Sequence, residues 1–200
     1  MNDGNVFELV LHHRYAEPDA RDFSGHGNDG YSAWQHGDGN GPQAAVFDGV
    51  RDRIFVPPSR TLARPGGVRT ELVVRLDELG HRRTLIEGYL SFAVYVEANG
   101  ALGAGVYRYL NWYGIGSRPA LVSLGTWATI TFMYTDDGVM ALFLNGDLVA
   151  DGYRRLGPAN GIEWPFGLSI GAWPDADQRV LKGQIAEVKL WRSPPPRLPR

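Results

Sequence analysis

The sequence predicts an all-β protein in which two antiparallel sheets pack face to face as a jelly-roll β-sandwich. Short apolar segments that suit β-strands recur about every 8–12 residues, and 26 glycines and 13 prolines supply turns between them. No segment of helical length carries an apolar stripe with the period of an α-helix. So many half-buried strands need two layers to cover their apolar faces, and 200 residues suffice for one such domain.

The first expected strand is Val6–Leu11, and two histidines follow it. Because neighbouring residues of a strand point to opposite faces, His12 and His13 cannot bind one metal ion together. We expect one of them to be buried and hydrogen-bonded and the other to be exposed.

A glycine-rich loop, Asp22–Gly30, comes next and carries several oxygen ligands. Its first half resembles an EF-hand loop, but Ala33 stands where that loop needs a bidentate glutamate. Two interpretations stay open. Asp22 and Asn28 could bind a hard cation together with backbone carbonyls and a distant carboxylate. Alternatively, Asp22, Ser24 and Asn28 hydrogen-bond their own turn.

The middle of the chain reads as a succession of strands. Gln43–Pro57 is expected to form a strand, a turn at Asp48-Gly49 and a second strand. In Val68–Leu76 the residues alternate, so that Leu72, Val74 and Leu76 share a buried face. Shorter strands bounded by turn residues are expected at Arg83–Glu87, Ser91–Glu97, Ala101–Tyr107 and Asn111–Ile115.

The strongest strand signal is a three-strand unit in the C-terminal half. Trp127–Tyr134 is rich in β-branched and aromatic residues, and Gly138–Ala150 holds two apolar runs around Asn145-Gly146. Asn-Gly tolerates the two positive φ angles of a tight hairpin turn.

The last expected strands are Gly167–Gly171 and Gly183–Trp191, and in the latter Ala186, Val188 and Leu190 share one face. The segment 193–200 is rich in proline and cannot continue a sheet. We therefore expect one domain over residues 1–192 and a disordered tail over 193–200.

Composition excludes several classes of partner. A net charge of −2 and a pI near 6.2 give no basic surface for nucleic acid or anionic lipid. The chain has no cysteine, hence no disulfide, and neither a secretory signal nor an apolar run of transmembrane length is visible. It is expected to be cytoplasmic or a fragment of an exported protein.

Four motifs stand in a recognisable order: Asp22–Gly30, Ala45–Gly49, Trp127–Gly146, and finally Leu168–Gly171 with Gly183–Trp191. In this order they resemble the laminin-G-like branch of the concanavalin A-like lectin/glucanase superfamily. The resemblance covers nearly the whole chain and implies two antiparallel sheets, one of them concave. One departure is Ala186, because the family usually has an acidic residue just before the glutamate found here at Glu187. Members bind glycans, proteins or lipids, or serve as structural modules, so the fold does not settle the function.

Many relatives hold a calcium ion near the first glycine-rich loop. Transferred to the matching positions, this resemblance implies Asp22, Asn28, Asp48 and Glu187 as candidate calcium ligands.

No catalytic residue is predicted. A retaining glycosidase needs two nearby carboxylates, and related glucanases place them two residues apart on one strand. Here the residue two places after Glu71 is Val73, and the residue two places after Glu187 is Lys189. Fragments similar to jelly-roll polysaccharide lyases occur in reversed order, and Ala186 stands where the histidine base belongs. Lyase or glycosidase activity is therefore the less favoured function.

The best candidate for ligand binding is the aromatic segment Tyr107–Tyr113. Its rings could stack on sugar faces while polar side chains bond hydroxyls, or the rings could fill the core instead. A second aromatic site is the Trp-Pro turn at Trp173. The candidate ligand-binding residues are Tyr107, Arg108, Tyr109, Asn111, Trp112, Tyr113 and Trp173.

Two functions remain from these observations. The favoured one is a non-catalytic carbohydrate-binding, lectin-like module that binds a glycan. The alternative is a protein-interaction or assembly module of a larger bacterial or phage-like complex, in which an exposed sheet face or edge docks a partner protein.

Overall fold

The computed structural model describes residues 6–16, 19–33, 35–36, 43–64, 66–163, 165–174 and 178–194, and the structural statements below concern those residues. They form fifteen β-strands and no α-helix. The strands are β1 (Glu8–Arg14), β2 (Tyr31–Ala33), β3 (Gln35–His36), β4 (Ala45–Asp48), β5 (Arg53–Val56), β6 (Val68–Leu76), β7 (Arg83–Gly88), β8 (Phe92–Val96), β9 (Leu102–Arg108), β10 (Asn111–Gly116), β11 (Trp127–Tyr134), β12 (Val139–Leu144), β13 (Asp147–Tyr153), β14 (Leu168–Ile170) and β15 (Lys182–Arg192).

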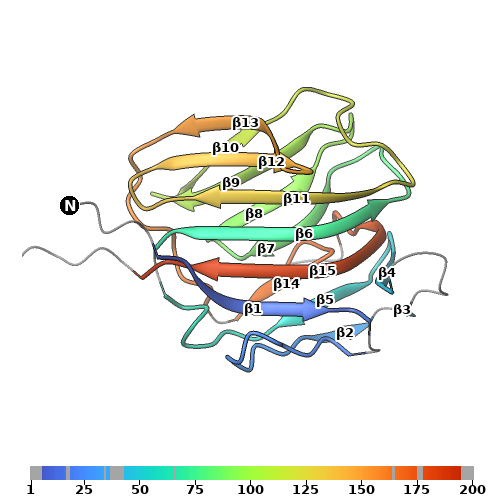
Figure 1. The fold of residues 1–200 in the computed structure, drawn as a ribbon, viewed down its shortest axis with the longest axis horizontal. Coiled ribbons are helices and arrows are strands. Elements are labelled where there is room, and N and C mark those ends of the chain that lie inside the picture. The colour runs from blue at the N-terminus through green and yellow to red at the C-terminus, as the bar shows by residue number, and fades with distance from the viewer. Residues whose placement is uncertain are drawn as a thin grey trace, which may run out of the picture.

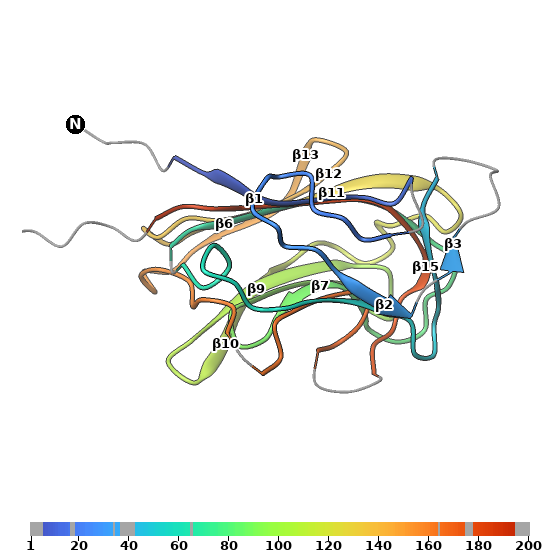
Figure 2. The same ribbon diagram turned by 90° about the horizontal axis from the view of Figure 1, so that it is seen from below.

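The strands build two antiparallel sheets that lie over one another as two layers (Figures 1 and 2). The eight-stranded sheet has the order β13-β12-β11-β6-β15-β4-β3, with β1 also paired to β15. The seven-stranded sheet has the order β10-β9-β8-β7-β14-β5-β2. The prediction of a two-sheet β-sandwich is confirmed. In the described part of the chain, no helix is long and apolar enough to cross a membrane.

The core lies between the two sheets and follows the strand alternation. In β6 buried and half-buried residues alternate along the whole strand, and the buried ones are Val68, Thr70, Leu72, Val74 and Leu76. Inward-facing residues of both sheets join one hydrophobic cluster. Their burial supplies the main driving force for the fold.

The three-strand unit forms as expected. Strand β11 pairs with β12, and β12 with β13. The turn between β12 and β13 uses Asn145 at φ +53° and Gly146 at φ +89°, which are the two positive φ angles that the dipeptide predicts.

The segment 43–57 forms a strand, a turn and a strand, but its two strands belong to different sheets. Strand β4 pairs with β15 and β5 with β14. One carboxylate oxygen of Asp48 accepts the backbone N–H groups of Val50, Arg51 and Asp52 at 2.8–3.1 Å. This turn carries the chain from one layer to the other.

The expectation for the last strand was wrong about Ala186. In β15, Ile185 faces the core with Val188 and Leu190, and the pairing with β6 shifts register between Ile185 and Glu187. Ala186 is the extra residue of a β-bulge, and its carbonyl accepts the N–H of Tyr15 at 3.1 Å. As a result, odd-numbered residues such as Ile185 face the core before the bulge, and even-numbered residues such as Val188 face it after the bulge.

The expectation for the two histidines was wrong as well, because both are buried. The glycine-rich loop returns over β1, where the N–H of Phe23 donates to the carbonyl of His12 at 2.8 Å. His13 bonds the carbonyl of Asn28 through Nε2 at 2.8 Å, on the other face of the strand.

Ordered structure extends past the predicted domain end. Ser193 is buried, and its Oγ accepts the N–H of Gly67 at 2.5 Å. The disordered tail was predicted over 193–200, and residues 195–200 of it lie outside the described residues.

Candidate ligand-binding cleft

A cleft of about 370 Å³ opens on the seven-stranded sheet, on the face turned away from the core. Strands β7 to β10 form its floor, and the loop between β14 and β15 covers one side. Figure 2 shows the described ends of this loop, in orange-red, on the side of the seven-stranded sheet that faces away from the other layer. The lining residues are Arg82, Thr84, Glu87, Ala93, Tyr95, Gly105, Trp112, Tyr113, Gly114, Trp173 and Arg179.

The floor is hollow because small residues meet there in register. Glu87 of β7 lies opposite Ala93, Ala93 opposite Gly105, and Gly105 opposite Gly114. Three of these four positions carry a methyl group or no side chain. The strand pleat turns the next residues, such as Ile86, into the core.

Aromatic and cationic side chains form the walls. The Tyr95 ring lies so close over Gly103 that a Cβ there would approach its Cε2 to 2.2 Å, so a larger residue at this position would displace the ring. The guanidinium of Arg82 lies 4.2 Å from the Tyr95 ring centroid, and its Nε donates to Glu97 at 3.1 Å. Trp112 is 41% exposed and therefore accessible to a ligand.

The loop between β14 and β15 holds Trp173 and Arg179 over the floor. The carbonyl of Arg179 accepts the N–H of Thr84 at 2.8 Å, which ties the loop to β7. The Arg179 guanidinium stacks 4.8 Å from the centroid of the Trp173 ring. Arg179 adopts φ +55°, a left-handed conformation that is unusual for this residue type and often occurs at functional sites.

Glu87 is the carboxyl group at the bottom of the cleft and is only 4% exposed. Burial raises its pKa to about 7, although the charges of Arg179 and Arg82 and a hydrogen bond from the Trp173 side chain act in the opposite direction. Near neutral pH this group can therefore donate a hydrogen bond when protonated and accept one when ionised.

The structure divides the predicted binding residues into two groups. Trp112, Tyr113 and Trp173 line the cleft, and the Tyr107 ring packs edge to face on Trp112 at 5.5 Å between centroids.

The other predicted residues are engaged in local structure. Arg108 donates to the Leu156 carbonyl at 3.2 Å and to Asn160 Oδ1 at 2.6 Å. The Tyr109 hydroxyl donates to the same Leu156 carbonyl at 3.3 Å. Asn111 Oδ1 accepts the N–H of Trp112 at 2.9 Å.

Sequence reasoning missed Arg82, Glu87, Tyr95 and Arg179. One signal was present, because Gly103 and Gly105 alternate in one strand and Gly114 and Gly116 in the next. Glycines at alternate positions of neighbouring strands leave one sheet face without side chains.

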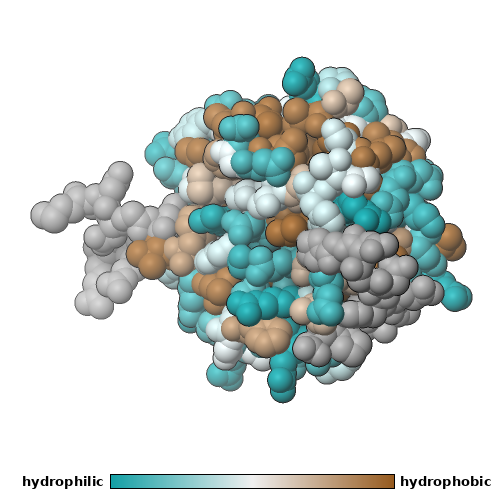
Figure 3. All heavy atoms as spheres, turned by 45° about the vertical axis from the view of Figure 1, so that its right-hand side comes forward, coloured by the Kyte–Doolittle hydropathy of each residue, from teal (hydrophilic) through white to brown (hydrophobic). Residues whose placement is uncertain are grey.

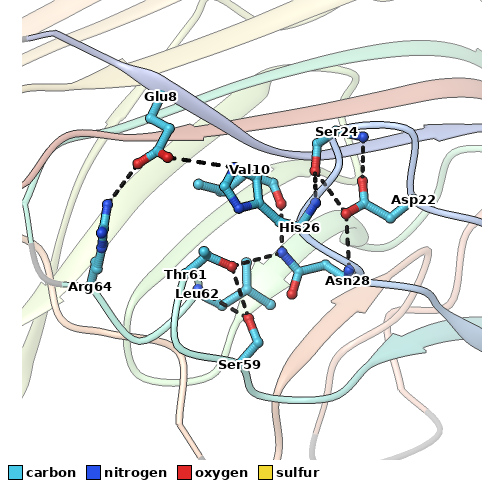
Figure 4. A network of polar contacts seen from close by, with 10 residues as sticks. All are labelled: Glu8, Val10, Asp22, Ser24, His26, Asn28, Ser59, Thr61, Leu62 and Arg64. Carbon is cyan, nitrogen blue, oxygen red and sulfur yellow. Dashed lines mark hydrogen bonds and ion pairs between the residues drawn. The ribbon is translucent and has the colours of Figure 1, made fainter.

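The calcium candidates Asp22 and Asn28 lie in a dense polar network (Figure 4). Asp22 Oδ1 accepts the N–H groups of His12 and Ser24, and Oδ2 accepts the Ser24 hydroxyl and the Asn28 N–H, all at 2.7–2.9 Å. Burial would raise the pKa of Asp22, but these bonds outweigh it and lower the pKa below its usual value. Asn28 Nδ2 donates to Val10 and Thr61, whereas Asn28 Oδ1 has no partner among the described residues.

The other two candidates lie elsewhere. Asp48 pairs with Lys182 in the ladder between β4 and β15, and Glu187 is five positions further along β15, about 16 Å at 3.3 Å per residue. Glu187 instead bonds His12 Nε2 at 2.7 Å and Lys189 Nζ at 2.9 Å. The four residues therefore do not fit one calcium site, and no group of three or more His, Asp or Glu in the described residues could hold a metal ion. Calcium binding by the Asp22 loop with backbone carbonyls stays a prediction.

Comparisons with known proteins agree with this architecture. Domain 4 of the extracellular arabinanase AbnA from Geobacillus stearothermophilus, solved in complex with arabinotriose, superposes with a TM-score of 0.68 at 20% identity, over 94% of this chain and 93% of that one. The binding domain of Paraclostridial Mosquitocidal Protein 1 gives a TM-score of 0.70 at 14% identity, over 95% of this chain and 50% of that one. The CBM40 of the Ruminococcus gnavus IT-sialidase, bound to α2,3-sialyllactose, gives 0.51 at 16% identity, over 65% and 76%.

At these identities the solved structures show a shared fold. The comparison with curated proteins found no match. The family model Laminin_G_3, described as the concanavalin A-like lectin/glucanases superfamily, matches residues 48–195, which is well over half of the chain. The chain therefore belongs to the concanavalin A-like lectin/glucanase superfamily.

Proposed function

We propose that this chain is a non-catalytic carbohydrate-binding module that holds a saccharide in the cleft on the seven-stranded sheet. The observation that carries the proposal is a hollow floor of small residues between the rings of Trp112 and Trp173, with the Glu87 carboxyl at its bottom. Aromatic rings stack on the apolar faces of sugars, and a few polar groups fix the orientation of the bound ligand.

Two structures with a similar fold support this proposal. The arabinanase domain was solved with arabinotriose and the CBM40 with sialyllactose. These saccharides are ligands of those proteins. Because the sequence identities are low, the ligand of this chain has to be inferred from the side chains of its own cleft.

The chemistry of the cleft supports binding over hydrolysis. A glycosidase of the usual kind requires two carboxyl groups across the scissile bond. The described lining residues include one carboxyl group, that of Glu87, and their other ionisable side chains are arginines and tyrosines.

A protein-interaction role is the second candidate, and one observation favours it. Exposed apolar residues gather near β10 and β13, including Leu110 at 90%, Tyr109 at 68% and Tyr153 at 64% exposure. Figure 3 shows hydrophobic residues along the upper edge of the molecule, where β10, β12 and β13 lie in Figure 1. The similar structure from Paraclostridial Mosquitocidal Protein 1 is the binding domain of that protein.

A glycan array followed by calorimetric titration tests the proposal. The wild type should bind at least one oligosaccharide, and Trp112→Ala and Trp173→Ala should each weaken binding about tenfold or more, the loss expected when a stacking ring is removed. Leu110→Ala and Tyr153→Ala are matched controls that remove exposed apolar side chains outside the cleft. Binding that survives both tryptophan substitutions, or no binding to any glycan, contradicts a saccharide site in this cleft.

A further inference from the structure

We infer that the cleft selects saccharides that carry a carboxylate over their neutral counterparts, with the sugar carboxylate paired to Arg179 beside the buried Glu87 carboxyl. This inference rests on the proposed function and names the ligand class of the same cleft.

The charges around Glu87 point to an anionic ligand. Arg82 precedes β7 and is neutralised by Glu97, its partner after β8, at an N–O distance of 2.5 Å. The remaining described lining residues of β8, β9 and β10 carry no charge, and Ser169, opposite Glu87 on β14, is neutral.

Arg179 is the second arginine that lines the cleft. In the described part of the chain, no carboxylate lies within ion-pair distance of it. Arg53, on β5, lines the neighbouring pocket rather than this one. Asp175 and Asp177 belong to the Arg179 loop by sequence and lie outside the described residues.

Glu87 does not cancel this positive charge in mildly acidic solution. With its pKa raised to about 7 by burial, the group is neutral below that pH and its O–H can donate to a carboxylate oxygen. Above that pH its own negative charge repels an anionic ligand. The net positive charge of the described groups of the cleft therefore falls as the pH rises through about 7.

Arg179 is held in a form that suits a carboxylate. Its guanidinium carbon lies 4.8 Å from the centroid of the Trp173 ring, and this cation–π contact uses none of the N–H donors of the guanidinium. A fork of parallel N–H donors matches the two oxygens of a carboxylate. The loop backbone bond to Thr84 and the stacking contact fix the side chain before a ligand arrives, which lowers the entropy lost on binding.

The test uses matched oligosaccharides that differ only at the carboxylate, namely uronate oligosaccharides and their methyl esters, together with sialylated glycans and their sialyl methyl esters. Dissociation constants are measured for the full chain at pH 6 and pH 8.5. We expect the acid to bind about tenfold or more tightly than its ester at pH 6, as for a charge-assisted bidentate pair. This preference should shrink at pH 8.5.

Two variants assign the preference to its residues. Arg179→Met keeps an apolar side chain on Trp173 and should abolish the acid-over-ester preference while the ester still binds. Glu87→Gln should keep the preference at pH 6 and retain it at pH 8.5. Arg82→Met, at the cation already paired with Glu97, is the matched control and should change the preference less than Arg179→Met. Thermal melts at each pH check that every variant is folded.

The outcomes are distinguishable. If acid and ester bind equally, or if the preference survives Arg179→Met, the inference is overturned while a Trp112-dependent saccharide site stands. If no saccharide of either kind binds, the proposed function fails and the inference fails with it.

Discussion

Replacing Glu87 with glutamine should stabilise the protein at alkaline pH and leave its stability almost unchanged in acid. The pKa of Glu87 is raised from 4.5 to about 7 in the folded protein. A raised carboxyl pKa means that the folded state holds its proton more tightly than the unfolded state. Its contribution to stability is therefore full below pH 4.5 and is lost as pH rises through 7.

The magnitude follows from the size of the pKa shift. At 1.36 kcal/mol per pH unit, a shift of roughly 2.5 units corresponds to about 3 kcal/mol. Glutamine has the same shape, keeps an acceptor for the Trp173 side chain and never ionises. The free energy of unfolding of Glu87→Gln minus that of the wild type should thus grow from about zero at pH 4.5 to about 3 kcal/mol at pH 8.5.

Urea denaturation at half-unit steps between pH 4.5 and 8.5 measures this difference. Comparing variant with wild type removes other titrations, such as that of His13, whose pKa burial lowers in both proteins. Glu163→Gln, at an exposed glutamate, is the matched control and should give a flat difference. A flat difference for Glu87→Gln as well would refute the reasoning that burial of this carboxyl controls its pKa.

Three further predictions concern glycine geometry, the Asp22 loop and calcium. Gly171→Ala should lower the free energy of unfolding, measured in urea, by about 3 kcal/mol. The reason is that φ is +83° at Gly171 and the new Cβ would lie 2.2 Å from Phe47 Cε1. Gly146→Ala, at φ +89° in open space, is the comparison and should cost about 1 kcal/mol. Asp22→Ala should cost roughly 3 kcal/mol in the same assay because it removes all four hydrogen bonds to the carboxylate; a loss below 1 kcal/mol would contradict the role of this carboxylate in the loop. If calcium added after EDTA treatment raises the melting temperature, Asp22→Asn should abolish the rise and Asp48→Asn should leave it intact, and equal loss in both variants would show that they share a site after all.

Local signals allowed much of the fold to be predicted from sequence. The strands β6 and β11 to β13 follow alternation and Asn-Gly turn chemistry, which are properties of the segments themselves. The bulge at Ala186 was not predictable in this way. It depends on a hydrogen bond from Tyr15, which is remote in sequence, and alternation within one strand carries no information about such a partner.

The candidate site was predicted only in part for the same reason. Trp112 and Trp173 stand out as large aromatic residues beside turns, and both line the cleft. Glu87 ends the expected strand Arg83–Glu87, and nothing in that segment marks it as a buried carboxyl group. Burial raises its pKa, and the Trp173 and Arg179 side chains, which act against that rise, belong to a loop that follows much later in the chain.

The bulge in β15 also governs how this strand compares with the same strand in other members of the superfamily. Downstream of Ala186, Glu187 and Lys189 lie on the outer face of the sandwich, and Val188 lies inside. If a relative lacks the inserted residue and its strand is aligned without a gap at Ala186, inward-facing positions of that relative fall opposite Glu187 and Lys189. Identical letters in two aligned sequences could then occupy opposite sides of the same sheet, so a functional assignment carried along this strand holds only between chains that share the insertion.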